Sequence, residues 1–290
     1  MQKDKTIILT HRGLDPDKGE YFGESSYEAF DDQLRRGFGI EFDIRFTKDR
    51  VPIALHDKTI ERITHGKDSR LVSEISCEEL TEIFSSQGTL VTIPNLFSLI
   101  EKNTSDATWS ALHVKHDHQN ESDLNTLLEI LNKTDYSKYI IFDTSIAIAK
   151  YIREKNPSIQ IFASVAHPYD IKRFNSAVGG TLLSLKELEE HSAIFSGAWL
   201  DEWDKLDEHN NQKKLYTTDT FNRVRLKGLK IAVVSPELHG TSPNLLGNES
   251  HPDAVNKDVL TARMQEILQL EPDAYCTDYP DHVKNLLTNV

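Results

Sequence analysis

The amino-acid sequence predicts an α/β protein that folds as a (β/α)8 barrel, the TIM-barrel architecture, with a short strand extension after the second strand. Eight short apolar runs recur along the 290 residues, and nearly all of them precede a stretch with helical periodicity. The runs are apolar rather than cleanly alternating, as is typical of strands buried on both faces. Eight strand–helix units in a chain of this length match the barrel.

The first unit has clear boundaries. The apolar run 6–11 precedes a helical pattern in which Ser25 or Ser26 can act as the N-cap and Gly37 can end the helix. The next apolar run, 39–47, follows that glycine directly. These signals predict a strand, a helix and a second strand.

A third run, 51–57, follows a polar turn and looks like the second strand folding back on itself. The rest of the first half predicts helices at 77–84 and 93–103, a strand at 110–116 and a helix at 121–134. The second half repeats the rhythm, with strands at 139–145, 159–166, 193–203, 230–237 and 273–280 and helices at 146–156, 168–176, 217–228, 256–268 and 281–287.

A doubly wound open sheet is the competing architecture, because hydrophobic periodicity cannot distinguish it from a barrel. No glycine-rich nucleotide-binding loop follows the first strand, which weakens that alternative. No linker or low-complexity tract divides the chain, so residues 1–290 are expected to form a single domain.

Composition narrows the partners. The 33 basic and 46 acidic residues give a net charge of −13, which argues against nucleic acid or an anionic membrane as a partner. No segment approaches the ~18 apolar residues of a membrane span, and no signal-peptide pattern is present, so we expect a cytoplasmic protein. Cys77 and Cys276 have no metal-type spacing and read as reduced thiols.

Ionisable residues collect where the predicted strands end. In a (β/α)8 barrel the chemistry takes place at the C-terminal ends of the strands. The residues found there are His11, Arg12, Glu41, Asp43, His56, Asp57, His113, Lys115, Asp117, Asp143, Asp201, Asp204, Glu237 and Asp278. This distribution predicts an active site at that end.

Glu41 and Asp43 are two residues apart on one strand, so both carboxylates face the same way. Two like charges so close need a cation or a basic partner. Oxygen ligands of this type suit one divalent cation, Mg²⁺, Ca²⁺ or Mn²⁺. The alternative is that nearby arginines such as Arg45 neutralise the pair.

His11 and His56 lie on different strand ends, where one could accept a proton while the other donates one. Each could also be a structural histidine. Arg12 and Lys115 would provide positive charge for an anionic group. Metal ligands, two histidines and two cations together favour metal-assisted phosphodiester cleavage, and no GxSxG sequence suggests a serine hydrolase.

At these residues the sequence resembles the glycerophosphodiester phosphodiesterase family. The matching segments are HRG (11–13), ESSYEAF (24–30), GIEFDIRFTKDRVPIALHD (39–57), IERITHGK (60–67) and CTDYPD (276–281). The resemblance implies a (β/α)8 barrel and hydrolysis of a small phosphodiester with one divalent cation. It also implies an acid–base pair, a phosphate-binding pair and a metal-binding pair, respectively His11 and His56, Arg12 and Lys115, and Glu41 and Asp43.

One departure from the family pattern concerns the metal. The family has an acidic ligand two residues before the lysine on the third strand, where this sequence has His113. His113 could ligate the ion, which would shift preference towards Mn²⁺, Co²⁺ or Zn²⁺. Alternatively it only hydrogen-bonds Glu41 or Asp43, or Asp117 supplies the carboxylate, although Asp117 would lie ~13 Å further along an extended strand.

A second departure concerns the substrate. The segment AVVSPELHG (232–240) replaces a W-T-V-N-like segment of the family. Glu237 and His239 could bind a hydroxyl-rich leaving group such as a polyol or sugar, or the loop could make no ligand contact. Two other functions remain open: a phospholipase-like lyase that forms a cyclic phosphate, and a weakened relative that only binds a phosphorylated ligand.

Overall fold

A computed structural model describes residues 6–18, 21–103, 108–202, 206–207, 209, 211–213, 215–238 and 252–288. Asp204 and His239, both singled out in the sequence, lie outside the described residues. Within the described residues, no helix combines the length and apolar character that crossing a bilayer requires.

The fold is a (β/α)8 barrel with one additional strand, as the sequence predicted. The sheet contains nine strands in the order β1-β9-β8-β7-β6-β5-β4-β2-β3, and β1 also pairs with β2. The strands are β1 (Ile7–His11), β2 (Gly39–Phe46), β3 (Pro52–Ala54), β4 (Ser110–Val114), β5 (Tyr139–Phe142), β6 (Gln160–Ala166), β7 (Gly197–Asp201), β8 (Lys230–Val234) and β9 (Ala274–Thr277). Strand β3 runs antiparallel to β2, which confirms the predicted extension.

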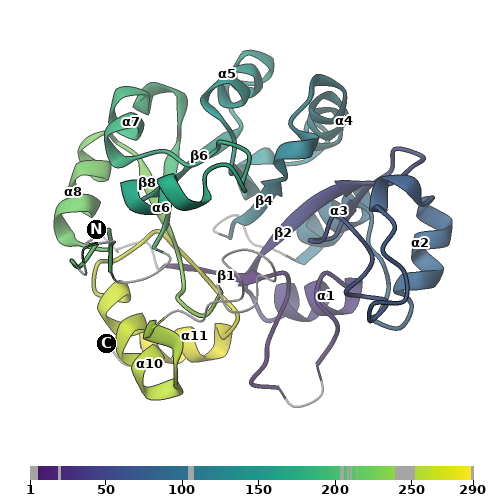
Figure 1. Cartoon of the computed structure of the whole chain (residues 1–290), viewed down its shortest axis with the longest axis horizontal. Helices are drawn as coiled ribbons and strands as arrows, with labels where there is room; N and C mark the ends of the chain where they lie inside the picture. The colour runs from purple at the N-terminus through teal and green to yellow at the C-terminus, as the bar shows by residue number, and fades with distance from the viewer. Residues whose placement is uncertain are drawn as a thin grey trace. The chain divides into compact units, whose positions relative to one another are not determined.

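The α-helices follow the strands along the chain (Figure 1). They are α1 (Tyr27–Arg35), α2 (Cys77–Phe84), α3 (Ile93–Asn103), α4 (Glu121–Leu131), α5 (Ile146–Lys155), α6 (Pro168–Phe174), α7 (Leu185–Glu190), α8 (Thr218–Leu226), α10 (Lys257–Leu268) and α11 (Pro280–Thr288). Ser26 is the N-cap of α1, accepting a hydrogen bond from the Ala29 amide. Helix α7 was not predicted from the sequence. It has only six residues and begins with a capping box between Ser184 and Glu187.

The chain divides into two compact units, one formed by Thr10–Ile140 and the other by Met1–Leu9 with Ile141–Val290. The residues predicted to act in catalysis, phosphate binding and metal binding belong to the Thr10–Ile140 unit, whereas Glu237 belongs to the other. The expected single domain stays a prediction.

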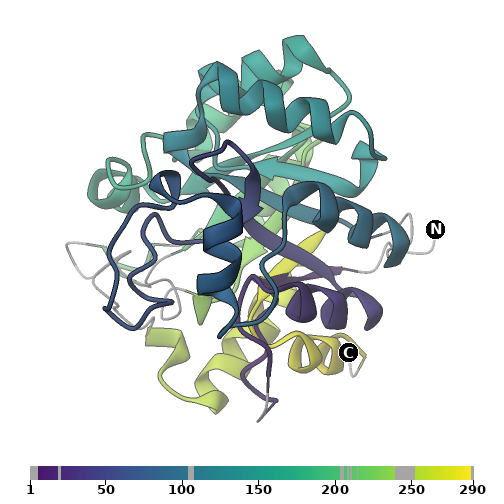
Figure 2. The same ribbon diagram turned by 90° about the vertical axis from the view of Figure 1, so that its right-hand side faces the viewer.

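Strand β2 organises the Thr10–Ile140 unit. All eight of its residues are buried. Phe42 packs between Phe30 of α1 and Phe97 of α3, with ring centroids 6.3 Å apart in both pairs. Helix α1 lies beside β2 in Figure 1, and the view turned by 90° agrees (Figure 2). Because side chains alternate along a strand, Glu41 and Asp43 point to the opposite face from Phe42.

The segment after β3 has a hydrophobic cluster of its own, which anchors His56 and Asp57. Leu55 and Ile60, on either side of these two residues, are both buried in it. The cluster comprises Ile53, Leu55, Ile60, Ile63, Val72, Ile75, Leu80, Phe84 and Leu90. The strand extension therefore fixes the segment that carries a predicted catalytic histidine.

Candidate active site

A sharp turn at the end of β1 places His11 and Arg12. Arg12 and Gly13 both have left-handed backbone conformations, with φ values of 53° and 72°. A side chain at position 13 would also meet Ala29 of α1, because a Cβ atom there would lie 3.0 Å from the Ala29 Cβ atom. Glycine is therefore favoured at this position, and the turn leaves His11 and Arg12 buried, with exposed fractions of 6% and 2%.

Three cationic or hydrogen-bonding side chains converge on Asp43. The parallel register of β2 and β4 sets His113 opposite Asp43. The Lys115 Nζ and His113 Nδ1 atoms lie 2.7 and 2.8 Å from Asp43 Oδ1, and the Arg12 Nε atom lies 3.2 Å from Asp43 Oδ2. The structure thus brings together four of the residues predicted to bind metal or phosphate.

The two carboxylates of β2 have opposite electrostatic environments. Burial opposes ionisation of Asp43, but the charge of Lys115, the hydrogen bond from His113 and the charge of Arg12 hold its pKa well below the usual value. Burial and the charge of Asp43 raise the pKa of Glu41. Within the described part of the chain, the buried Glu41 Oε2 atom accepts no hydrogen bond. Glu41 is therefore the carboxylate that needs a further positive partner.

The side chains of Glu41, Asp43 and His113 fit a divalent cation. One ligand atom from each lies within 4.8 Å of the others. Two carboxylate oxygens and an imidazole nitrogen are a common donor set for such ions. The alternative, in which Arg45 neutralises Glu41 and Asp43, is wrong. The Arg45 Nη1 atom is instead 2.8 Å from Asp117 Oδ1, and its Nε atom is 3.1 Å from the His56 carbonyl oxygen.

The strand that carries His113 ends before Asp117. Strand β4 ends at Val114, and His116–His118 form a 3-10 turn, so the alternation expected for 110–116 stops early. Asp117 is paired with Arg45 rather than with the acidic pair. His113 Nδ1 contacts both Asp43 Oδ1, at 2.8 Å, and Lys115 Nζ, at 3.1 Å. Ligation of a metal by His113 stays a prediction.

His56 has its own carboxylate partner. Its Nδ1 atom lies 2.7 Å from Asp57 Oδ1. Burial, then the charges of Lys115 and Arg12, hold the pKa of His56 well below its usual value. The ring is therefore neutral near pH 7, with Nδ1–H donated to Asp57 and a lone pair on Nε2. The sequence did not predict this contact of Asp57 with the His56 ring, although the two residues are adjacent in the chain.

Glu237 lies in the other unit and is held by its own neighbours. Its Oε1 atom accepts hydrogen bonds from Thr277 Oγ1 at 2.6 Å and from the Asp278 amide at 3.1 Å, and its Oε2 atom accepts one from Ser235. Burial, with the nearby charge of Asp278, raises the pKa of Glu237 to about 7. These contacts join the ends of β8 and β9. The predicted contact of Glu237 with substrate stays a prediction.

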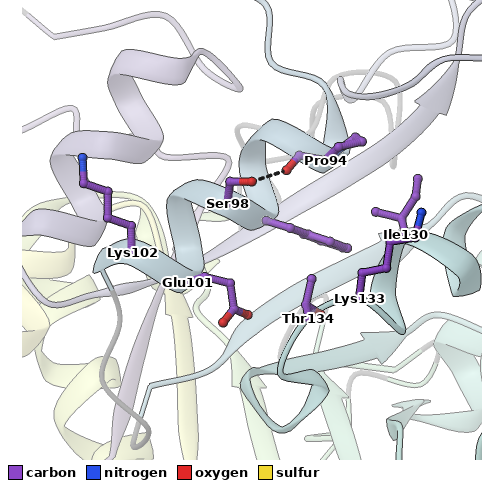
Figure 3. Close-up of a pocket in the computed structure, with 8 residues that line it drawn as sticks. Pro94, Ser98, Glu101, Lys102, Ile130, Lys133 and Thr134 are labelled. Carbon is purple, nitrogen blue, oxygen red and sulfur yellow. Dashed lines mark hydrogen bonds between the residues drawn. The ribbon is translucent and has the colours of Figure 1, made fainter.

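A cavity of about 570 Å³ lies on the helical side of the Thr10–Ile140 unit, between α3 and the C-terminal end of α4. Figure 3 shows Ser98 and Glu101 of α3 facing it together with Ile130 and Thr134. No predicted site residue lines it. The cluster of Glu41 and Asp43 on β2 with His113 on β4 is therefore the better candidate for the active site.

The chain matches the model of the glycerophosphoryl diester phosphodiesterase family over residues 11–282. A glycerophosphodiester phosphodiesterase of Bacillus altitudinis is 36% identical over 102 residues, which is 33% of this chain and 39% of that protein. One from Caldanaerobacter subterraneus subsp. tengcongensis is 29% identical over 103 residues, 33% of this chain and 40% of that protein. The alignments thus span about two fifths of these curated relatives.

Solved structures agree on the fold. A glycerophosphoryl diester phosphodiesterase of Parabacteroides distasonis superimposes with a TM-score of 0.66 at 16% identity, covering 100% of this chain and 88% of that one. A phosphodiesterase of Oleispira antarctica, in complex with the product sn-glycerol-3-phosphate, gives a TM-score of 0.64 at 15% identity, covering 98% and 97%. At these identities the similarity shows the barrel alone.

Proposed function

The chain belongs to the glycerophosphoryl diester phosphodiesterase family, and we propose that it is a metal-dependent phosphodiesterase. Its substrate would be a small glycerophosphodiester or a related polyol or sugar phosphodiester. One observation carries the proposal: Asp43 contacts Arg12, Lys115 and His113 while Glu41 shares its strand face. The groups proposed to bind the phosphate and those proposed to bind the metal therefore lie in one largely buried cluster.

The two histidines would move the protons. His56 is neutral near pH 7, so its Nε2 atom can accept a proton from the attacking water. Asp57 stabilises the imidazolium that forms, through the 2.7 Å contact with Nδ1. His11 would donate a proton to the leaving oxygen, from its buried position at the end of β1.

Arg12 and Lys115 would hold the phosphate. Both already contact Asp43, so their side chains are oriented before a substrate binds. A divalent cation held by Glu41, Asp43 and His113 would stabilise negative charge on the phosphate oxygens as a Lewis acid. The net charge of −13 still argues against a nucleic-acid partner, and a cytoplasmic location stays a prediction.

The ligand role of His113 makes a prediction about metal preference. His113→Ala should weaken Mn²⁺ binding strongly, because a third donor is lost. Asp117→Ala is the matched control and should change it little, because Asp117 is paired with Arg45. His113→Glu should shift preference towards Mg²⁺ or Ca²⁺, since an oxygen donor replaces nitrogen. Isothermal titration calorimetry at neutral pH measures each affinity, and unchanged Mn²⁺ affinity in His113→Ala would rule the ligand role out.

The substrate class is tested with a panel of glycerol, polyol, sugar and nucleotide phosphodiesters, following release of the monoester. We expect hydrolysis of a polyol or sugar diester to exceed that of glycerophosphocholine. Glu237→Ala should then raise KM for the best substrate, because the carboxylate near the ends of β8 and β9 is lost. High activity on glycerophosphocholine that Glu237→Ala leaves unchanged would contradict this specificity. Hydrolysis of no member of the panel would contradict the proposed function.

A further inference from the structure

Arg62 connects two parts of the candidate site. It lies in the turn segment after β3, between the buried residues Ile60 and Ile63. Its Nε atom is 2.6 Å from Asp57 Oδ2, and its Nη2 atom donates to Glu24 Oε1. One edge of a single guanidinium therefore binds carboxylates from two distant segments of the chain.

Each of these carboxylates also contacts a predicted site residue. Asp57 Oδ1 lies 2.7 Å from His56 Nδ1, and Glu24 Oε1 lies 3.6 Å from Arg12 Nη1. The side chains thus form a continuous series from His56 through Asp57, Arg62 and Glu24 to Arg12. It joins the predicted proton acceptor to a predicted phosphate ligand.

We propose that Arg62 is a positioning residue that fixes the tautomer of His56 through Asp57 and the guanidinium of Arg12 through Glu24. The role rests on the proposed function. Among the described residues, Arg62 contacts the site through these two carboxylates, so we assign it a positioning role rather than a catalytic one.

Physical chemistry gives Arg62 a role that a lysine could fill only in part. A carboxylate bound at only one oxygen can rotate, whereas Asp57 is bound at Oδ1 by His56 and at Oδ2 by Arg62. A planar guanidinium offers donors with fixed directions, but an ammonium is a single point of charge. The buried neighbours Ile60 and Ile63 hold the backbone from which Arg62 reaches both carboxylates.

The test compares Arg62→Gln with Arg70→Gln. Arg70 is a matched control, because it also binds two carboxylates, Asp68 and Glu79, and its side chain is 43% exposed against 36% for Arg62. We expect Arg62→Gln to lower kcat by about 10–100-fold, as removal of partners behind site residues commonly does. Arg62→Lys should recover part of the loss, and Arg70→Gln should behave like the wild type.

A second readout does not depend on activity. In ¹⁵N NMR of the histidine rings, the His56 signals, assigned by their loss in His56→Ala, should show a proton on Nδ1 in the wild type. In Arg62→Gln they should move towards a mixture of tautomers, and Arg62→Lys provides the same comparison if the glutamine variant does not fold. Unchanged His56 signals, or equal losses of kcat in Arg62→Gln and Arg70→Gln, would overturn the role. A wild-type protein inactive on every phosphodiester would instead contradict the proposed function, while the NMR comparison would still test the link to His56.

Discussion

Replacing His56 by alanine is expected to lower kcat by about 10²–10⁴-fold and to leave the protein folded. The ring is the proposed proton acceptor, and its Nδ1 atom lies 2.7 Å from Asp57 Oδ1, which leaves Nε2 for the proton. The fold should survive because Asp57 keeps its 2.6 Å contact with Arg62. His11→Ala should show a loss of similar size, since it removes the proposed proton donor. Steady-state kinetics on the best substrate and thermal unfolding measure both effects.

The pH dependence of kcat/KM is a second test of the role of His56. His56 must be neutral to accept a proton, and its pKa lies well below the usual value of about 6.5. In the wild type, kcat/KM should therefore hold as the pH falls through about 6.5 and decline only at lower pH, and His56→Ala should lose this acid limb. Near-wild-type rates in both histidine variants would show that this pair does not move the protons.

Asp43→Asn is expected to have the largest effect on the site as a whole. It removes a proposed carboxylate ligand and leaves Arg12 and Lys115, both buried or nearly so, without the charge they contact. Breaking a buried ion pair on one side costs about 3–5 kcal/mol, so the free energy of unfolding of the metal-free protein should fall by about that amount. Divalent-cation binding should fall below detection by calorimetry, and hydrolysis should fall with it.

Asp117→Asn is the control for this variant. Its carboxylate is paired with Arg45 and lies 3.6 Å from Lys58, away from the acidic pair. It should keep cation affinity and lose only a little stability, because the Asp117 side chain is 23% exposed against 1% for Asp43. Wild-type Mn²⁺ affinity in Asp43→Asn would place the cation elsewhere in the protein.

The barrel could be predicted because its signals are local. Apolar runs, the Ser26 cap and the period-two placement of Glu41 and Asp43 each depend on a few neighbouring residues. Strand order then followed from the known architecture rather than from the residues. Short elements were harder: α7 is six residues long, and β7 begins only at Gly197 because a 3-10 turn precedes it.

The contacts of long side chains could not be predicted. Arg45 shares a strand face with Asp43, yet it reaches past the site to Asp117 and to the His56 carbonyl. Glu24 and Arg62 are 38 positions apart, and both lie outside helices and strands. Spacing says nothing about such a pair, because loops set its geometry. The sequence therefore indicated which ionisable groups would lie together, but not the loop residues that contact them.

Attack by water has to be distinguished from attack by a hydroxyl of the substrate, which would leave a cyclic phosphate. The measurement is hydrolysis of the best phosphodiester in ¹⁸O-enriched water with the divalent cation present, followed by mass spectrometry of the phosphate product. We predict one ¹⁸O atom in the phosphomonoester of the first turnover, no cyclic product, and loss of the signal in His56→Ala. An unlabelled cyclic phosphate, or tight binding of the diester with no turnover at all, would contradict water attack at this site.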